Sequence, residues 1–417
     1  MPELNAVKQE TSDVSRTFPS ALARYVLAAT VARAADSAAA VAVVLLILSP
    51  QSGVSNPGLD AGVLSACLTA PHLLGPFLGR RLDLARNGWR VIAAACLIYG
   101  IAVAAAAFSL GRTPLWGTGL LLVVAGASGP LLTGGFSSRL SALVRADQRR
   151  QRRAQGWDAT TYGVGGTVGP AVAAAVSGVA SPMIAILAVA AAALLAAVLT
   201  MTLPQVSTDG AVRPGSVPSP AHVLRLIAVT GPLRRTAYVT MALAMPGAAI
   251  SIAAVGMASR LEINTTSAAL LPAVFGLGSL AGSMALMIAP LKGSAEKAVI
   301  RLAAAAGLAF ALAALVPAFP YALVAFGVAG VLNSLFFTAT LASRAEYAPD
   351  SARAQVFIWT AALKVTAAAV GTALAGALIG IDPRLPLLAG GALSIAAAAA
   401  ASVETRGAYR PTTRDNG

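Results

Sequence analysis

Ionised side chains within long apolar stretches are the residues of this sequence best suited to chemistry. Arg33 and Asp36 lie three positions apart, so on a helix they would share one face and could form an ion pair. Lys364 lies well inside another apolar stretch. In a lipid bilayer such a charge costs about 2.5 to 3.5 kcal/mol even on the mildest scale, so its presence there indicates a function.

These charges allow several roles. A carboxylate at Asp36 that exchanges a cationic partner for a proton would couple proton entry to the release of a bound molecule. The alternative is a permanent pair with Arg33 that never titrates. Lys364 would hold an anionic substrate, latch onto Asp36, or serve as a buried structural lysine. His72 could relay a proton near neutral pH, although such a histidine is more often a satisfied polar residue.

The composition indicates that these residues belong to a membrane protein. The chain is 57% hydrophobic and 11% charged, whereas soluble domains carry about 25% charged residues. A helix of about 20 apolar residues crosses a bilayer. We therefore predict an all-α membrane protein with twelve crossings, at residues 20–48, 59–79, 91–110, 117–143, 157–180, 182–203, 234–258, 267–290, 299–316, 321–343, 354–380 and 385–401.

The longest polar break, residues 204–233, is rich in Pro, Ser and Gly and separates six crossings from six. The predicted organisation is a cytoplasmic tail (1–19), a six-helix bundle (20–203), a cytoplasmic loop (204–233), a second six-helix bundle (234–401) and a cytoplasmic tail (402–417). An offset of 202 residues aligns Trp157 with Trp359 and Tyr162 with Lys364. The bundles are therefore expected to be pseudo-symmetric copies with a substrate site between them.

Four side chains are candidates for lining that site, although aromatic residues on helices more often pack in cores. They are Tyr162, Asn333, Phe336 and Phe337.

The net charge of +14 comes mainly from Lys and Arg in breaks on one side of the predicted topology. This positive-inside bias places both termini in the cytoplasm of a cell with the chain in its plasma (inner) membrane. The same charge favours contact with anionic lipid headgroups rather than with nucleic acid. Trp89, Trp116 and Trp157 fall at the ends of predicted crossings, where tryptophan commonly marks the membrane interface.

Residues 78–90, "LGRRLDLARNGWR", resemble the signature G-x-x-x-D-R-x-G-R-R of the major facilitator superfamily. Gly79 and Asp83 hold the signature's spacing, while the basic part, with Arg86 and Arg90, is displaced by two residues. The resemblance implies the two-bundle major facilitator fold and a charge cluster that holds an inner gate. Two further charges expected at the inner ends of helices would join this gate network, namely Arg139 and Asp158.

Residues 163–178, "GVGGTVGPAVAAAVSG", resemble the G-x-x-x-G-P motif of the drug and metabolite exporters of this superfamily through Gly165, Gly169 and Pro170. Small residues let helix backbones approach closely, so we expect a gate seam between the bundles, with a bend at Pro170. One departure concerns the fourth crossing. Many such exporters carry an arginine at its middle, but here "VVAGASGPLLTGGFSS" contains none before Arg139.

The resemblance implies a secondary transporter that exports small organic molecules by proton antiport with alternating access. A proton-coupled uptake permease of the same fold is the alternative. An enzyme or sensor is disfavoured, because the sequence has no metal-ligand cluster, no Ser/His/Asp set and no phosphate-binding loop. The expected partners are a small-molecule substrate, protons and membrane lipids, with no cofactor or metal and with a monomeric chain.

Overall fold

The structure is a computed structural model, and it describes residues 2–49, 52, 57–144, 147–204, 217–268 and 270–408. The longest parts of the predicted segments outside the described residues are 205–216 of the central loop and 409–417 of the C-terminal tail. The described part contains twelve helices that are long and apolar enough to cross a membrane. The predicted number of crossings is therefore confirmed.

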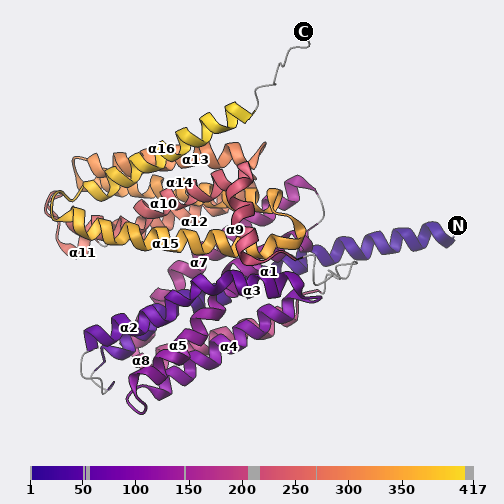
Figure 1. Cartoon of the computed structure of the whole chain (residues 1–417), viewed down its shortest axis with the longest axis horizontal. Helices are drawn as coiled ribbons and strands as arrows, with labels where there is room; N and C mark the ends of the chain where they lie inside the picture. Colours follow the sequence, from indigo (N-terminus) through magenta and orange to yellow (C-terminus); the bar gives the residue numbers. More distant parts are fainter. Residues whose placement is uncertain are drawn as a thin grey trace, which may run out of the picture. The chain divides into compact units, whose positions relative to one another are not determined.

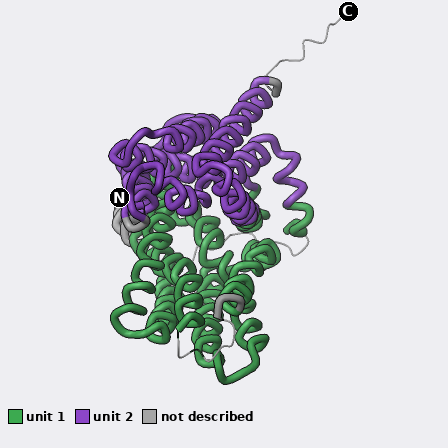
Figure 2. Tube along the Cα trace, turned by 90° about the vertical axis from the view of Figure 1, so that its left-hand side faces the viewer, with its two compact units in different colours: residues 1–223, 349–362 green, residues 224–348, 363–417 purple. Residues whose placement is uncertain are grey.

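The chain divides into two compact units, coloured separately in Figure 2. Unit 1 comprises residues 1–223 and 349–362, and unit 2 comprises residues 224–348 and 363–417. The start of the eleventh crossing thus belongs to unit 1, although the sequence repeat assigns that crossing to the second bundle. The reason is local, because this segment hydrogen-bonds and packs against residues of the first half.

Unit 1 contains the first six crossings of the chain (Figure 1). Its elements are α1 (Pro2–Ile47), α2 (Pro57–Thr69), η2 (Ala70–Leu74), α3 (Gly75–Leu84), α4 (Gly88–Ser109), α5 (Leu115–Pro130), η3 (Leu131–Gly135), α6 (Phe136–Leu140), η4 (Ser141–Leu143), α7 (Gln148–Val179), α8 (Pro182–Met201) and η6 (Asp350–Ala352). The first residues of α9 (Pro220–Val229) and of α15 (Arg353–Ile379) complete it.

Unit 2 contains the rest of α9 and α15, and it adds α10 (Gly231–Gly256), α11 (Thr265–Ala268), α12 (Leu270–Ile288), α13 (Ala295–Leu315), α14 (Phe319–Tyr347) and α16 (Leu385–Ala408). Within this unit α14 packs on α12 and α13, and α16 packs on α10 and α13. Glycines allow one of these contacts to be close. A Cβ at Gly282 would lie 2.7 Å from the carbonyl oxygen of Val331, so only glycine fits between α12 and α14 there.

Several helices begin at a side chain that accepts a hydrogen bond from the backbone of the first turn, which stabilises the helix start. These N-cap residues are Asn87, Asp147, Ser181 and Ser294. Asp147 sets the start of α7 at Gln148, so the predicted start of the fifth helix at residue 157 is wrong. The arginine-rich segment continues the helix beyond the apolar stretch because Arg and Gln are good helix formers.

Two crossings are interrupted, and the interruptions position candidate residues. The second crossing passes from α2 through the 3₁₀ turn η2, which contains Pro71, into α3. The fourth passes from α5 through Pro130 into one turn of π-helix, η3. Proline lacks the N–H that a regular helix needs, and the freed backbone groups allow local 3₁₀ and π geometry. His72 and Thr133 lie in these two irregular turns.

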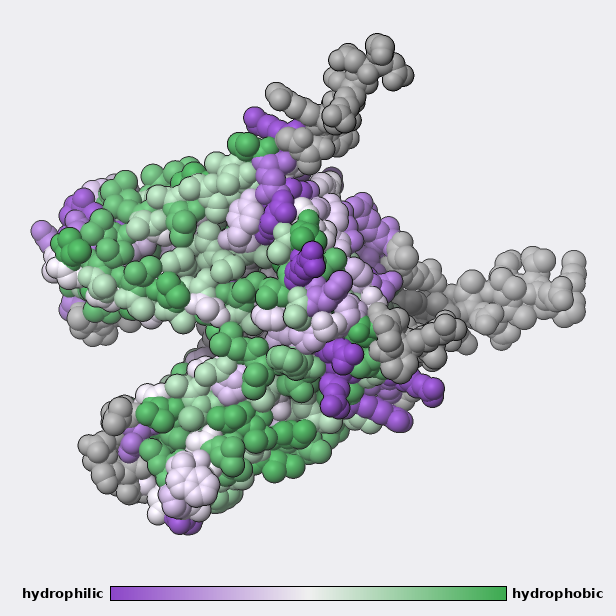
Figure 3. Space-filling model, viewed as in Figure 1, coloured by the Kyte–Doolittle hydropathy of each residue, from purple (hydrophilic) through white to green (hydrophobic). Residues whose placement is uncertain are grey.

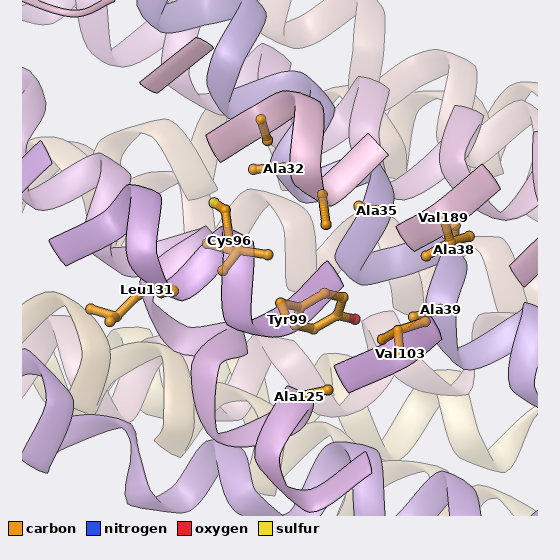
Figure 4. Packing of buried hydrophobic residues seen from close by; sticks show 14 of the residues in the cluster. Ala32, Ala35, Ala38, Ala39, Cys96, Tyr99, Val103, Ala125, Leu131 and Val189 are labelled. Carbon is orange, nitrogen blue, oxygen red and sulfur yellow. The ribbon is translucent and has the colours of Figure 1, made fainter. Parts of the chain in front are cut away.

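The core of unit 1 is built from closely packed small residues. Alanines of α1, including Ala32, Ala35 and Ala39, are buried beside Tyr99 and Val103 of α4 (Figure 4). Small side chains bring α1 close to α7 and α8, which pack on it.

An aromatic cluster corrects one sequence interpretation. Trp89 is only 5% exposed, and its ring lies 6.2 Å from that of Tyr25 and 6.1 Å from that of Phe136. It is therefore a core residue of unit 1 and not part of an interfacial belt. Trp116 is 74% exposed at the start of α5, where an interfacial residue is expected.

Large apolar side chains are exposed along the helix flanks of both units, including Ile101, Leu120, Val198, Ile288 and Val324. Figure 3 shows hydrophobic residues over the sides of the helices and hydrophilic residues towards their ends. An apolar exposed surface of this kind is suited to lipid rather than to water.

Candidate functional site

The first candidate cluster surrounds Arg33, which is 1% exposed in α1 of unit 1. Its Nη1 atom lies 2.8 Å from Oδ1 of Asp158 on α7. Nη1 also donates to the hydroxyl of Thr161, and Nη2 donates to Oγ of Ser137 at 2.9 Å and to the carbonyl of Thr133 at 3.2 Å. The guanidinium therefore connects α1 with the irregular fourth crossing and with α7.

Asp158 also has several hydrogen-bond partners. Tyr25 donates its hydroxyl to Oδ1 at 2.6 Å, and Ser137 donates to Oδ2 at 2.6 Å. The ring of Tyr162 lies under the guanidinium, 3.5 Å from Cζ of Arg33. Tyr162 is thus placed in this cluster within unit 1, and the cation–π contact adds to the ion pair. Buried charges with this many partners are suited to a fixed structural role.

The predicted Arg33 to Asp36 pair is wrong. On a helix, a long side chain points back toward the N-terminus, and from α1 this direction brings the guanidinium to Asp158. Asp158 is also removed from the predicted gate network, because it is bound to Arg33. An i, i+3 spacing shows which residues can meet on one helix, but it carries no information about competing partners on neighbouring helices.

The second cluster contains Asp36 and His72. Nε2 of His72 lies 3.8 Å from Oδ1 of Asp36, and the side chains are 20% and 17% exposed respectively. Nδ1 of His72 is buried and has no hydrogen-bond partner among the residues that the structure describes. A Cβ at Gly129 of α5 would lie 2.5 Å from Nε2 of His72, so glycine at that position leaves room for the imidazole. Within the described chain, Asp36 has no Lys or Arg partner.

Two groups of α4 also face Asp36. The hydroxyl of Tyr99 donates a long hydrogen bond, 3.5 Å, to its backbone carbonyl, and the buried thiol of Cys96 is an electrostatic neighbour of its carboxylate. These are weak or uncharged partners. Among the described residues of unit 1, Asp36 and His72 therefore form a loose pair without a Lys or Arg counter-ion.

The third cluster lies at the start of α15, within unit 1. Asp83 accepts hydrogen bonds from the backbone N–H groups of Ala354 and Gln355, at 2.9 Å and 3.1 Å. A carboxylate at a helix N-terminus satisfies free N–H groups and interacts favourably with the helix dipole. Gly79 packs against this turn, where a Cβ would lie 3.2 Å from Cα of Gln355. Asp83 thus binds the turn that the chain's second half contributes to unit 1.

The basic residues of this cluster differ from those expected. Arg139 donates to the carbonyl of Leu82 and is an electrostatic neighbour of Asp83. Arg86 and Arg90, which the signature suggested, are exposed. Within the described residues their side chains form no ion pair. The displacement of the basic part by two residues carries both side chains into the loop and the first turn of α4, away from Asp83.

The glycines of the fifth crossing pack inside unit 1. A Cβ at Gly165 would lie 2.8 Å from Cβ of Arg33, and one at Gly169 would collide with the carbonyl of Ala34. The predicted seam between the bundles is therefore wrong in its partner, since α7 makes this contact with α1. Pro170 follows within the same helix.

An apolar cavity of about 140 Å³ lies beside this contact, between α1, α7 and α8. Every residue that lines it is apolar, among them Ala38, Val172 and Ala188. A cavity without polar groups provides no means of orienting a polar ligand.

In unit 2, Lys364 of α15 lies with Nζ 4.5 Å from the ring centroid of Phe337 on α14. Asn333 is half-buried one helical turn from Phe337. Phe336 is 4% exposed in the hydrophobic core of unit 2, so its prediction as a pocket residue is wrong. Adjacent residues of a helix point in different directions, which is why Phe336 and Phe337 have different surroundings.

Sequence reasoning missed a further ion-pair cluster in unit 2. Arg235 of α10 binds Glu296 of α13, and its Nη1 lies 2.8 Å from Oε1 of Glu404 on α16. Arg234 also binds Glu404. Opposite charges predicted on the same membrane side were the available signal, but both glutamates fall outside the predicted crossings. Among the described residues, no three His, Cys, Asp or Glu side chains are grouped so as to hold a metal ion.

Comparison with known proteins gives one result for the sequence and another for the fold. No family model and no curated protein matches the sequence. Solved structures do match: the proton:xylose symporter XylE has a TM-score of 0.68 at 13% identity, with 92% of this chain and 95% of that chain covered. XylE is described as a major facilitator superfamily protein. This chain has the major facilitator fold.

Two more structures with the major facilitator fold agree. The E. coli fucose:proton symporter FucP has a TM-score of 0.68 at 14% identity, with 93% of this chain and 98% of that chain covered. The human organic anion transporter MFSD10 has a TM-score of 0.65 at 16% identity, with 91% and 99% covered. The predicted fold class is confirmed, and the protein is a multi-pass membrane protein.

The fourth crossing carries no arginine at its middle. The structure brings a guanidinium to that crossing from α1, because Arg33 binds Thr133 and Ser137 there. A basic group therefore contacts the fourth crossing even though the sequence of that crossing carries none at its middle.

Proposed function

We propose that this protein is a secondary active transporter that exports small organic molecules, a drug or metabolite, in exchange for protons by alternating access. The observation that carries the proposal is the pair of Asp36 and His72 in membrane-crossing helices of unit 1, with side chains 17% and 20% exposed. Its charge is free to change because Arg33 is bound to Asp158.

The geometry of the pair suits proton exchange. A separation of 3.8 Å is longer than a hydrogen bond, so the carboxylate is not committed to the imidazole. Either group can accept a proton, and the change in net charge would alter the cost of keeping the pair away from water. A conformational change that opens the pair to one side and then to the other would carry that proton across the membrane.

The contact between Asp83 and the start of α15 supports a conformational role. Its two hydrogen bonds attach the first turn of α15, whose later residues belong to unit 2, to unit 1. We infer that these bonds form and break during alternating access. Asp83 and Arg139 would then be gate residues, with both termini in the cytoplasm as the positive-inside bias suggests.

Export is favoured by Gly165, Gly169 and Pro170, which match the exporter motif, and the two glycines pack closely on α1, the helix that carries Asp36. Uptake is the second candidate, because two of the similar structures are described as proton symporters. Growth of cells that produce the protein separates the two directions. Protection against a panel of toxic compounds supports export, whereas sensitisation supports uptake.

Proton coupling is tested in proteoliposomes with a compound found by that screen. An imposed pH gradient should drive its movement in the natural protein, and Asp36→Asn should abolish the dependence on the gradient. His72→Gln should weaken that dependence. Asp60→Asn is the matched control, because Asp60 lies in the first turn of α2 rather than beside the pair. Gradient-driven movement that persists in Asp36→Asn would refute the assignment.

A further inference from the structure

Lys364 is a membrane-embedded cation for which the described residues of unit 2 supply no counter-ion. It lies about 16 Å along the axis of α15 from Arg353, at 1.5 Å per residue, which is about half the thickness of a hydrocarbon core. A charge at this depth is costly unless it is compensated.

The carboxylates of unit 2 are all far from this depth. Among the described residues they lie near helix ends or in connections, and they are Glu262, Glu296, Glu346, Asp382 and Glu404. Within that same part of the chain, Lys364 forms no ion pair and no hydrogen bond. Arg344 of α14 is an electrostatic neighbour with the same sign of charge, which adds to the cost of the ammonium. An anion beside Lys364 would lower that cost.

The surroundings of the ammonium also restrict what kind of anion fits. Asn333, Phe337 and Arg344 lie four and seven positions apart on α14 and so share one face of that helix. The ring of Phe337 lies 4.5 Å from Nζ of Lys364 and provides an apolar surface. The half-buried amide of Asn333 provides a polar group one turn away. An anion with an apolar body can contact all three kinds of group.

We propose that Lys364 binds the carboxylate of a small organic acid with an apolar body, with Phe337 against that body. The proposal deepens the proposed transport function and rests on it for its assumption that the acid is carried. An ammonium forms an ion pair as well as a hydrogen bond with a carboxylate, whereas the corresponding neutral amide can accept the hydrogen bond but carries no charge to pair with it. Lys364 is then a specificity-determining residue for acids over amides.

The test uses purified full-length protein in lipid nanodiscs and three matched pairs of probes. These are benzoate, phenylacetate and hexanoate, each compared with its amide, and inorganic phosphate serves as an anion without an apolar body. Thermal unfolding at increasing probe concentration gives an apparent affinity. At least one acid should bind about tenfold or more tightly than its amide. Phosphate should bind more weakly than that acid.

Variants assign the effect to the side chain. Lys364→Met keeps the length and apolar stem of lysine, and it should remove the tenfold preference for the acid while leaving amide binding unchanged. Lys364→Arg keeps the charge and should retain a preference. Lys297→Gln removes an exposed charge from the same unit, and it should change neither the preference for the acid nor the binding of the amide. Unfolding of each variant without probe shows whether it is folded.

Three results would overturn the proposal. The first is that no acid binds more tightly than its amide. The second is that Lys364→Met keeps the preference, and the third is that phosphate binds as tightly as the acids. Transport measurements distinguish failure of the acid-binding proposal from failure of the proposed transport function. Proton-driven movement of neutral compounds alone would refute only the acid site, whereas acid binding without any transport would refute only the transport function.

Discussion

Replacement of Asp158 by asparagine should be among the most destabilising single changes in unit 1. Arg33 and Asp158 are each 1% exposed, and the carboxylate accepts hydrogen bonds from Arg33, Tyr25 and Ser137. Removing one charge of a buried pair leaves the other uncompensated, which costs about 3 to 5 kcal/mol. Asp158→Asn keeps the size of the side chain, so the loss would come from the charge rather than from a cavity.

Asp36→Asn is the matched comparison. Asp36 is 17% exposed, and its carboxylate lies 3.8 Å from Nε2 of His72. Loss of so loose a pair should change the free energy of unfolding by less than about 1 kcal/mol. Both variants and the natural protein can be unfolded with denaturant in mixed micelles and followed by circular dichroism.

A double variant tests the Arg33–Asp158 pair by removing both of its charges. Arg33→Met together with Asp158→Leu removes both charges, so it should recover part of the stability that Asp158→Asn loses. Recovery would be incomplete because the hydroxyls of Tyr25 and Ser137 would lose an acceptor. The pairing would be refuted if Asp36→Asn were as destabilising as Asp158→Asn, or if Arg33→Met rescued the former rather than the latter.

Three further outcomes follow from packing, capping and exposure. Gly169→Ala should cost about 1 to 3 kcal/mol of unfolding free energy because its Cβ collides with a carbonyl of α1, whereas Gly166→Ala, with nothing within 4 Å, should be neutral or slightly stabilising. Asp83→Ala should increase amide hydrogen exchange in the first turn of α15, with a loss of about 1 to 2 kcal/mol, while Arg86→Gln should leave it unchanged. In a variant whose only tryptophan is Trp116, brominated lipids should strongly quench the tryptophan fluorescence, since that side chain is 74% exposed. Amide exchange in Asp83→Ala equal to that of the natural protein, or weak quenching of Trp116, would contradict these expectations.

The two charged pairs of unit 1 differ in burial and in the number of hydrogen bonds that they form. Arg33 and Asp158 are buried and multiply hydrogen-bonded, so they hold helices together. Asp36 and His72 are loosely paired and partly exposed, and they are the pair to which we assign proton exchange in the proposed function. Two charges of α1 thus have different partners, although they are only three residues apart.

The sequence by itself determined the features that depend on local composition. The twelve crossings follow from segment length and hydropathy, because each helix must satisfy its own backbone in lipid whatever its neighbours are. The predicted all-α fold followed from the same pattern. Asp36 and Lys364 could be singled out as well, because the cost of a charge in an apolar segment is also a local property.

Only the tertiary structure decided which side chains meet. Arg33 binds Asp158 rather than Asp36, Gly169 packs on α1, and Trp89 and Phe336 lie in cores. Each of these depends on the rotation and approach of helices far apart in the sequence. Composition and spacing specify what one helix can offer, whereas ion pairs and close packing are chosen between helices, where several partners compete for the same group.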